Sequence, residues 1–408
     1  MRACKAVATA VCLAVSCTGL LAGCRTEEND MHKTYTPSEE AVLPLGRTYY
    51  ADDMRWCAYS GTGAAFTFTG TKAEITIAGD QIAEAPDNQA NYARIAVYVN
   101  EERVVDDQID QPEKTYTVFQ SDAAQEVTVR IVKLSECAMS TIAIKRITVD
   151  SQEGIHPAQP QSRLIEFVGD SITCGYGVDD EAAEHHFSTA TEDVTKAYAY
   201  RTAQTLEADY SMVSISGYGI LSGYTDSGKL QPHQIVPRYY PKLGFSNGSF
   251  GDKKPASIKW DFARQPDLVV INLGTNDSSY LSQDFDGRKD EFTAAYTAFL
   301  KQVREKNPAA VIICTMGTMG GEDLYPLIQQ AITDYTAETG DSQVRSYQSA
   351  TQKPANGLGS DWHPSALTHE LSAYVLADQI CTAIGREWSK IGLDAASDGT
   401  YDVKINTE

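Results

Sequence analysis

Hydrophobic and polar residues alternate with a period of two in short runs between residues 40 and 150. Alternation of this kind is typical of strands that bury one face. Turn residues separate the runs, which are Ala65–Thr69, Glu74–Ala78, Arg94–Val99, Glu126–Val132 and Ile142–Val149. The pattern therefore predicts an all-β domain, a sandwich, over residues 40–150.

A different pattern begins after residues 151–162, a polar stretch with two prolines that we interpret as a linker. Four continuous apolar runs predict buried strands at Leu164–Val168, Ser211–Ile215, Leu268–Leu273 and Val311–Thr315. Amphipathic stretches between and after them predict helices near Thr195–Leu206, Arg288–Lys306, Asp323–Glu338 and Ala366–Ile384. Buried strands that alternate with helices predict a parallel sheet covered on both faces. We assign this second domain to residues 163–393 and leave 394–408 as a C-terminal tail.

The N-terminus has the features of an export signal. Arg2 and Lys5 precede an apolar stretch, Val7–Leu21, that ends in Leu21-Ala22-Gly23-Cys24. This arrangement predicts a lipoprotein signal peptide over residues 1–23, a lipid on Cys24 and a polar tether over residues 24–39. The alternative, a transmembrane anchor, fits less well because the apolar run is shorter than the ~18 residues that a span needs. We expect a secreted lipoprotein of the bacterial cell envelope or surface, anchored to the membrane at Cys24.

Charge and cysteine content narrow the choice of partners. The 34 basic and 55 acidic residues give a net charge of −21, which repels phosphate backbones and argues against a nucleic-acid partner. Five of the nine cysteines lie beyond Cys24, so full pairing is impossible, and we place only one hypothetical disulfide, Cys57 with Cys137, in the first domain. No spacing of cysteine and histidine supports a metal site, and His185-His186 reads as a solvated loop.

Three polar motifs follow buried strands and should meet at the carboxyl edge of the sheet. Gly169-Asp170-Ser171 follows the first buried strand and offers the Ser171 hydroxyl as a nucleophile. The next two strands end near Gly219 and Asn276. Each motif alone is commonly an ordinary turn, but together the Ser171 N–H, the Gly219 N–H and Asn276 Nδ2 could form an oxyanion hole. Gly217 is the second choice for the glycine donor.

A fourth motif, Asp361-Trp362-His363-Pro364, precedes the last predicted helix. A neutral His363 could accept the Ser171 proton, and Asp361 could hold the opposite ring N–H, which would complete a catalytic triad. We also expect Trp362 to contact a sugar face, and Tyr218 to limit the space for the acyl group.

These four blocks, in this order, resemble the SGNH (GDSL-like) hydrolases, and the stretch Phe167–Gly177 is similar to carbohydrate esterase family 2 within them. The resemblance implies an N-terminal jelly roll, an α/β/α hydrolase domain and deacetylation of plant cell-wall polysaccharides. One position departs from the usual pattern. Most SGNH hydrolases carry the acid three residues before the histidine, where this chain has Ser360, and some family members use a backbone carbonyl instead. Asp361 or a backbone carbonyl could therefore orient His363.

We accordingly expect a serine esterase, monomeric and without metal or organic cofactor, that acts on acetylated xylan or glucomannan through an acetyl-Ser171 intermediate. Two alternatives remain at this point. A related SGNH esterase could act on bacterial-wall O-acetyl groups or on lipid esters, or the protein could be a non-catalytic glycan-binding surface lipoprotein. Hydrolysis of a chromogenic acetate ester would separate the enzymes from the binding protein.

Overall fold

The computed structural model describes residues 31–384, 391–395 and 401–405. The predicted signal peptide, Cys24 and the first part of the predicted tether lie outside the described residues. Within these ranges, no helix combines the length and the apolar character needed to cross a membrane.

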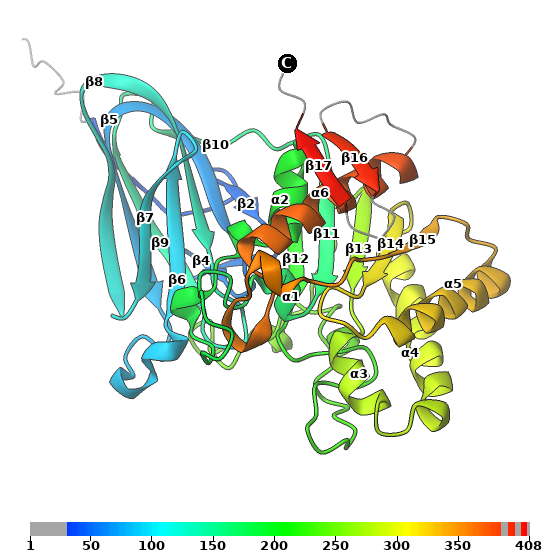
Figure 1. Ribbon diagram of the computed structural model, residues 1–408. Coiled ribbons are helices and arrows are strands. Elements are labelled where there is room, and N and C mark those ends of the chain that lie inside the picture. Colours follow the sequence, from blue (N-terminus) through cyan, green and yellow to red (C-terminus); the bar gives the residue numbers. More distant parts are fainter. Residues whose placement is uncertain (1–30, 385–390, 396–400, 406–408) are drawn as a thin grey trace, which may run out of the picture. The chain divides into compact units, whose positions relative to one another are not determined.

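The N-terminal region is an antiparallel sheet of ten strands, which confirms the all-β prediction (Figure 1). Seven strands follow the order β3-β4-β9-β5-β8-β6-β7, while β1 pairs with β9, and β2 and β10 pair with β5. The strands are β1 (His32–Tyr35), β2 (Leu43–Leu45), β3 (Thr48–Ala51), β4 (Met54–Cys57), β5 (Gly63–Gly79), β6 (Ala93–Val99), β7 (Glu102–Ile109), β8 (Glu113–Lys133), β9 (Ile142–Asp150) and β10 (Ile155–Pro157).

Two strands predicted separately, Ala65–Thr69 and Glu74–Ala78, are both parts of the long strand β5. The pairing of β5 with β8 shifts in register at Gly70, and this irregularity interrupts the alternation in the sequence. A Cβ atom at Gly70 would lie 2.2 Å from the Asp150 carbonyl oxygen, so the close approach of β9 requires glycine there.

The structure differs from the sequence prediction at three segments outside the main strands. His32–Tyr35, within the predicted tether, pairs with β9, and Ile155–Pro157, within the predicted linker, pairs with β5. The predicted tail contains part of the hairpin β16 (Ile391–Ala395) and β17 (Tyr401–Ile405). Strands this short are held by backbone pairing, which leaves little periodicity in the sequence. Cys57 and Cys137 are separate buried thiols, so the hypothetical disulfide between them is absent from the structure.

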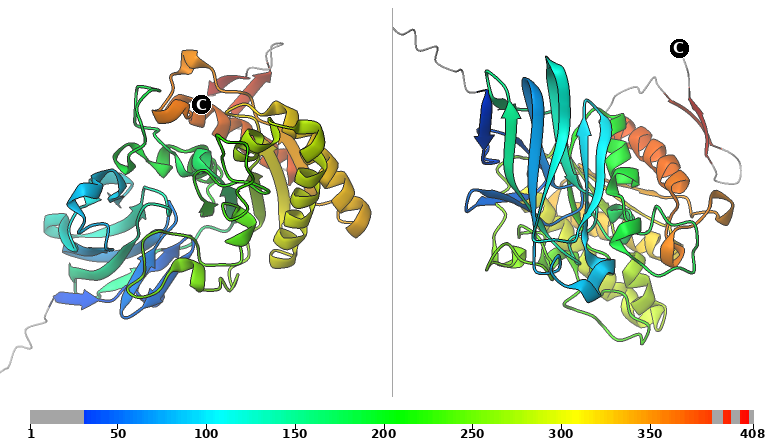
Figure 2. Two further views of the ribbon diagram at one scale, coloured as in Figure 1. Left: turned by 90° about the horizontal axis from the view of Figure 1, so that it is seen from below. Right: turned by 90° about the vertical axis from the view of Figure 1, so that its left-hand side faces the viewer.

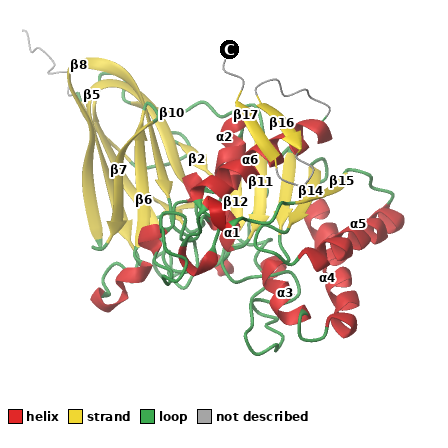
Figure 3. Ribbon diagram, in the orientation of Figure 1, coloured by secondary structure: helices red, strands yellow, loops and turns green. Residues whose placement is uncertain are grey.

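The C-terminal region contains a parallel five-stranded sheet with the order β12-β11-β13-β14-β15, as predicted for a doubly covered α/β domain. Its strands are β11 (Leu164–Gly169), β12 (Asp209–Ser214), β13 (Leu268–Asn272), β14 (Val311–Met316) and β15 (Val344–Gln348). Its helices are α1 (Ser171–Cys174), α2 (Tyr198–Thr205), α3 (Thr275–Leu281), α4 (Phe285–Lys306), α5 (Tyr325–Thr339) and α6 (Ala366–Ala383). Figure 3 shows the α-helices gathered around this sheet, whereas the N-terminal region consists mainly of strands.

Alternate residues of each central strand enter two different cores. Val269 and Ile271 of β13 pack in the core that contains α4 and α5. Leu268 and Val270 pack with α2 and α6 on the other face. Both cores also include residues of the N-terminal region, among them Tyr59 in the first and Leu134 in the second. The two regions are therefore packed together through shared apolar cores, and Figure 2 shows them from two further sides.

A buried ion pair also joins the two regions. The Arg47 guanidinium, from the N-terminal region, lies 3.0 Å from Glu166 Oε2 in the middle of β11, and both side chains are at most 5% exposed. Tyr240 donates a hydrogen bond to the other Glu166 oxygen at 2.7 Å. Because a buried charge is costly unless it is paired, this arrangement fixes how the N-terminal region sits on the parallel sheet.

Candidate active site

The predicted motifs meet at the carboxyl edge of the parallel sheet. Ser171 is the first residue of α1, directly after β11, and Asn276 lies at the start of α3, after β13 (Figure 1). Asp170 caps α1, since its carboxylate accepts a hydrogen bond from the Ile172 N–H at 3.1 Å. The cap holds the sharp turn that presents the Ser171 hydroxyl at the end of the strand.

His363 contacts the Ser171 hydroxyl. Its Nε2 lies 2.8 Å from Ser171 Oγ, and its Nδ1 lies 3.1 Å from each of the carbonyl oxygens of Ser360 and Asp361. A carbonyl oxygen can only accept a hydrogen bond, so Nδ1 must carry the ring proton in the neutral imidazole. Nε2 then has the free lone pair, which is the form that can take a proton from the serine.

The Asp361 carboxylate does not fill the role that the sequence predicted for it. It accepts hydrogen bonds from the Tyr176 hydroxyl at 2.8 Å and the Phe187 N–H at 3.0 Å, and it contacts His186 Nδ1 at 3.2 Å. The physical reason is the backbone, because Asp361 adopts a left-handed conformation with φ 49°. In this turn the carbonyl groups reach the imidazole, and the Asp361 side chain binds the loop that contains residues 176–187.

The Asp361 carboxylate holds Tyr176 beside His363. The Tyr176 ring stacks on the His363 imidazole with a centroid distance of 4.0 Å, and Phe187 stacks on Tyr176 at 4.2 Å. Burial acts to raise the pKa of Asp361, but hydrogen bonds from Tyr176, His186 and Phe187 outweigh it and keep this pKa below the usual range. Asp361 therefore remains a carboxylate, and it supports the imidazole through the aromatic stack.

The same surroundings keep His363 uncharged. Burial lowers the pKa of His363 to about 4, although the hydrogen bonds to the two carbonyls partly oppose this effect. The imidazole is thus neutral at neutral pH and available as a base.

The structure favours Gly217 over Gly219 as an oxyanion donor. The Gly219 N–H donates to the Gln234 carbonyl at 3.2 Å, and a Cβ atom at Gly219 would lie 2.1 Å from the Ser222 carbonyl oxygen. Gly217 is partly exposed, and a Cβ atom there would meet nothing within 4 Å. Its N–H has no acceptor in the described part of the chain. The Ser171 N–H, in the first turn of α1, has no partner within the helix either.

Asn276 connects the turn after β11 with the loop after β12. Its Nδ2 donates to Asp170 Oδ2 at 3.2 Å and to the Tyr218 carbonyl at 2.9 Å. Both amide hydrogens are therefore used in the structure. To donate to an oxyanion, the Asn276 amide would have to share the hydrogen that binds Tyr218.

Asp277, the residue after Asn276, holds the backbone of a neighbouring loop. Its carboxylate accepts hydrogen bonds from the consecutive N–H groups of Ile220, Leu221 and Ser222, at 2.8–3.2 Å. It fixes the loop after Gly219, and within the described residues it makes no hydrogen bond to Ser171 or His363. Burial raises the pKa of Asp277 to about 6 and that of Asp170 to about 7.

The two predicted substrate aromatics have different surroundings. Trp362, the residue before His363, is 55% exposed, so its ring is accessible. The Tyr218 ring is instead buried against Tyr239 and Phe245, so its side chain supports the loop from behind. Sequence reasoning missed Tyr224, which is also 55% exposed and whose N–H binds the Gly217 carbonyl at 2.8 Å. Its position five residues after Gly219 in the sequence could have indicated that it lies near this loop.

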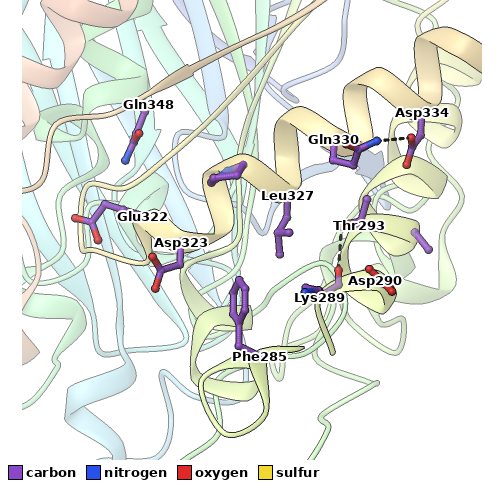
Figure 4. Close-up of a pocket in the computed structure, with 12 residues that line it drawn as sticks. Phe285, Lys289, Asp290, Thr293, Glu322, Asp323, Leu327, Gln330, Asp334 and Gln348 are labelled. Atoms are coloured by element: carbon purple, nitrogen blue, oxygen red, sulfur yellow. Dashed lines mark hydrogen bonds between the residues drawn. The ribbon is translucent and has the colours of Figure 1, made fainter. Parts of the chain in front are cut away.

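An open groove of about 870 Å³ lies between α4 and α5 (Figure 4). Phe285 and Leu327 line it together with polar and acidic side chains, including Asp323 and Asp334. Neither Ser171 nor His363 lines this groove, so it is separate from the candidate active site.

Comparison with known protein families gives two matches that together cover most of the described chain. Residues 167–371 match the GDSL-like Lipase/Acylhydrolase family, and residues 45–158 match the Carbohydrate esterase 2 N-terminal family. The first match contains Ser171, Asn276 and His363.

Three known proteins are similar over most of this chain. The Cellulase/esterase CelE of Acetivibrio thermocellus is 30% identical over 357 residues, which is 86% of this chain, but the chain spans only 40% of CelE. An acetylxylan esterase/glucomannan deacetylase of Cellvibrio japonicus is 26% identical, with 88% of this chain and 94% of that protein covered. The structure of an acetyl xylan esterase, Est2A, from the rumen bacterium Butyrivibrio proteoclasticus superimposes with a TM-score of 0.77 at 25% identity, and 87% of this chain and 98% of that chain are covered.

We predict that Asp361→Asn retains most of the activity toward a chromogenic acetate ester. The amide oxygen can still accept from the Tyr176 hydroxyl or the Phe187 N–H, and the carbonyls that orient His363 are unchanged. We expect kcat/KM to fall by less than about 10-fold, whereas loss of a base-orienting carboxylate in a triad costs about 10⁴-fold. His363→Ala is the control, and an Asp361→Asn variant as inactive as this control would restore the carboxylate to the triad.

We also predict the acid limit of kcat/KM, which reports groups of the free enzyme. His363 must be neutral to act as a base, and its pKa of about 4 means that protonation begins to remove activity only near this pH. Activity should therefore be nearly constant from pH 7 to pH 5 and should decrease below pH 4. A decrease centred between pH 6 and 7 would contradict this expectation. It would point to an unperturbed imidazole, or to a required ionised form of Asp170, whose pKa is about 7.

Proposed function

Because the chain belongs to the GDSL-like lipase/acylhydrolase family and carries the N-terminal domain of family 2 carbohydrate esterases, we propose that it is a serine esterase that removes O-acetyl groups from plant cell-wall polysaccharide. The observation that carries this proposal is the contact of 2.8 Å between Ser171 Oγ and the free lone pair of His363. The names of the Cellvibrio and Butyrivibrio relatives support an acetylated xylan or glucomannan as the substrate.

The first half of the reaction transfers the acetyl group to the enzyme. Ser171 Oγ attacks the acetyl carbonyl carbon while its proton moves to His363 Nε2. The carbonyl oxygen becomes an oxyanion, which the Ser171 and Gly217 N–H groups stabilise. Asn276 joins them as a third donor by sharing the hydrogen that it donates to the Tyr218 carbonyl. The C–O bond to the sugar then breaks, the proton on Nε2 passes to the sugar oxygen, and acetyl-Ser171 remains.

The second half of the reaction uses the same groups with water. His363 Nε2 takes a proton from water as its oxygen attacks the acetyl carbon, and a second oxyanion forms in the same site. Collapse of this intermediate breaks the bond to Ser171 Oγ, and the proton returns from His363 to the serine. Acetate is released and the resting enzyme is restored.

Exposed aromatic rings fit the sugar part of this substrate. Trp362 adjoins the base and Tyr224 adjoins the oxyanion glycine, and each is 55% exposed. Flat faces of this kind stack on the C–H faces of sugar rings. We assign both residues to carbohydrate binding outside the reacting acetyl group.

We place this esterase in the bacterial cell envelope, tethered through a lipid on Cys24. The support is the sequence Leu21-Ala22-Gly23-Cys24 after a short apolar stretch.

The proposed function predicts release of acetate from acetylated xylan or glucomannan and a preference for acetate over longer acyl groups. Chromogenic acetate, butyrate and octanoate esters should give decreasing kcat/KM, as the acetylxylan esterase relatives suggest. A site that fits only the acetyl group loses about 10–200-fold for a misfit methylene. Ser171→Ala should remove activity by about 10⁶-fold. Rising kcat/KM with chain length would favour a lipid esterase, and ester hydrolysis without release from the polysaccharide would overturn the substrate.

Trp362→Ala is the control that separates sugar binding from chemistry. This variant should raise KM for the acetylated polysaccharide by about 10-fold and leave the hydrolysis of the small acetate ester within about 2-fold, since a lost stacking contact costs on the order of 1 kcal/mol.

The location is tested by mass spectrometry of the N-terminus of the protein expressed with its full sequence in a bacterial host. We expect a mature chain that begins at Cys24 with fatty acid attached, and partition of the protein into the detergent phase. Cys24→Ala should abolish both. An unmodified Cys24, or cleavage at another residue, would contradict the lipid anchor.

A further inference from the structure

A buried carboxyl group of the N-terminal region contacts the loop that carries the oxyanion glycine. Glu136 lies in the segment between β8 and β9, and its side chain is fully buried. Its Oε2 accepts a hydrogen bond from the Ser216 N–H at 3.1 Å. Ser216 directly precedes Gly217, so this contact links the N-terminal region to the proposed oxyanion hole.

The backbone of Glu136 is held from two sides. Its N–H donates to Glu192 Oε2, a residue of the hydrolase region, at 2.7 Å. Its carbonyl accepts from the buried ammonium group of Lys133 at 2.8 Å. The neighbouring Cys137 thiol lies 3.4 Å from the carbonyl oxygen of Ser214, at the end of β12. The segment that carries Glu136 is thus fixed against the strand that leads to Gly217.

Apart from Ser216, the groups that act on the Glu136 carboxyl are the Ala138 N–H and the charge of Lys133. Its second oxygen, Oε1, has no hydrogen-bond partner in the described part of the chain. Burial raises the pKa of this carboxyl group, although its hydrogen bond with Ser216, the nearby Lys133 ammonium and the Ala138 N–H act in the opposite direction. A buried carboxyl group is costly, and a side chain packed only for stability would be apolar at this position.

The hydrogen bond between Glu136 and Ser216 can control the direction of the Gly217 N–H. The Gly217 N–H belongs to the peptide unit that begins at the Ser216 carbonyl, so a rotation of the backbone at Ser216 would turn this N–H away from the substrate. The Gly217 carbonyl, on the other side, accepts from the Tyr224 N–H at 2.8 Å. Gly217 has φ 79°, a conformation that glycine adopts easily. Because glycine has no side chain, its backbone is not held in this conformation by side-chain packing. Contacts on both sides are therefore needed to aim its N–H.

We propose that Glu136 is a positioning residue for the esterase reaction, and that the N-terminal region completes the oxyanion hole through its hydrogen bond to Ser216. The proposal rests on the proposed function. It assigns the N-terminal region a part in transition-state stabilisation, besides any part that it has in carbohydrate binding.

The test compares Glu136→Ala, which removes the acceptor, with Glu136→Gln, which keeps an oxygen at the same distance. Removal of one oxyanion donor costs about 10²–10³-fold in kcat. A donor that is present but misplaced should lower kcat less, by about 10-fold or more. We expect Glu136→Ala to lower kcat for a chromogenic acetate ester by about 10–100-fold with KM unchanged. Glu136→Gln should remain within about 3-fold of the unmodified protein.

A second readout reports the oxyanion hole itself. An alkyl boronic acid adds to Ser171 Oγ and forms a tetrahedral anion, so its inhibition constant should rise in Glu136→Ala by the same factor as kcat/KM falls. Asp80→Ala is the matched control. Asp80 is a buried carboxylate of the same region that accepts a hydrogen bond from the Thr141 N–H at 2.7 Å. In the described part of the chain it makes no hydrogen bond to Ser216 or Glu136, so its loss should lower the melting temperature without changing kcat.

Two outcomes would overturn the proposal: an unchanged kcat in Glu136→Ala, or a Glu136→Gln variant as impaired as the alanine variant. If Glu136→Ala does not fold, Glu136→Asp, which withdraws the acceptor by one methylene, should lower kcat at unchanged KM in the same way, and normal kcat in this variant would count against the proposal. Failure of the unmodified protein to hydrolyse the acetate ester would instead contradict the proposed function.

Discussion

The hydrogen bonds of one imidazole nitrogen determine the chemistry of this site. Nδ1 of His363 faces the carbonyl oxygens of Ser360 and Asp361, and neither can donate a proton. The ring must therefore keep its proton on Nδ1 and present the lone pair of Nε2 to Ser171. When Nε2 takes the serine proton, the two carbonyl dipoles also stabilise the positive charge that forms. A backbone turn thus performs the orienting task that a carboxylate performs in the familiar triad.

The rest of the site supports that turn and the loop opposite to it. Asp361 binds the hydroxyl of Tyr176, whose ring lies against the imidazole, and Asp277 binds three successive amides after Gly219. On the side of the N-terminal region, the Arg47–Glu166 pair and the contact between Glu136 and Ser216 fix β11 and the end of β12. Asp277 and Glu136 therefore bind backbone N–H groups of the loop after β12, whereas Asp361 and Glu166 also bind side chains.

The sequence predicted the elements whose signals are local. The apolar runs of β11 to β14 were recognisable, and the comparisons confirm the family resemblance that the four motifs suggested. The strand β15, Val344–Gln348, was missed because this edge strand alternates too weakly to form an apolar run. The role of Asp361 depended on a left-handed backbone, which residue spacing does not reveal. The choice between Gly217 and Gly219 could be made only once the Gly219 N–H was seen to bind the Gln234 carbonyl. The contact of Glu136 with Ser216 could not be predicted because it arises from the packing of two regions that are distant in the sequence.

The most direct test of this account is the protonation state of the His363 imidazole, measured by ¹⁵N NMR on protein with labelled histidine, with the His363→Gln variant for assignment. The account predicts a proton on Nδ1 and an unprotonated Nε2 at pH 7, and a change to the imidazolium only as the pH approaches about 4. A ring with its proton on Nε2, or an imidazolium already present at pH 6, would contradict the arrangement in which two backbone carbonyls prepare the base.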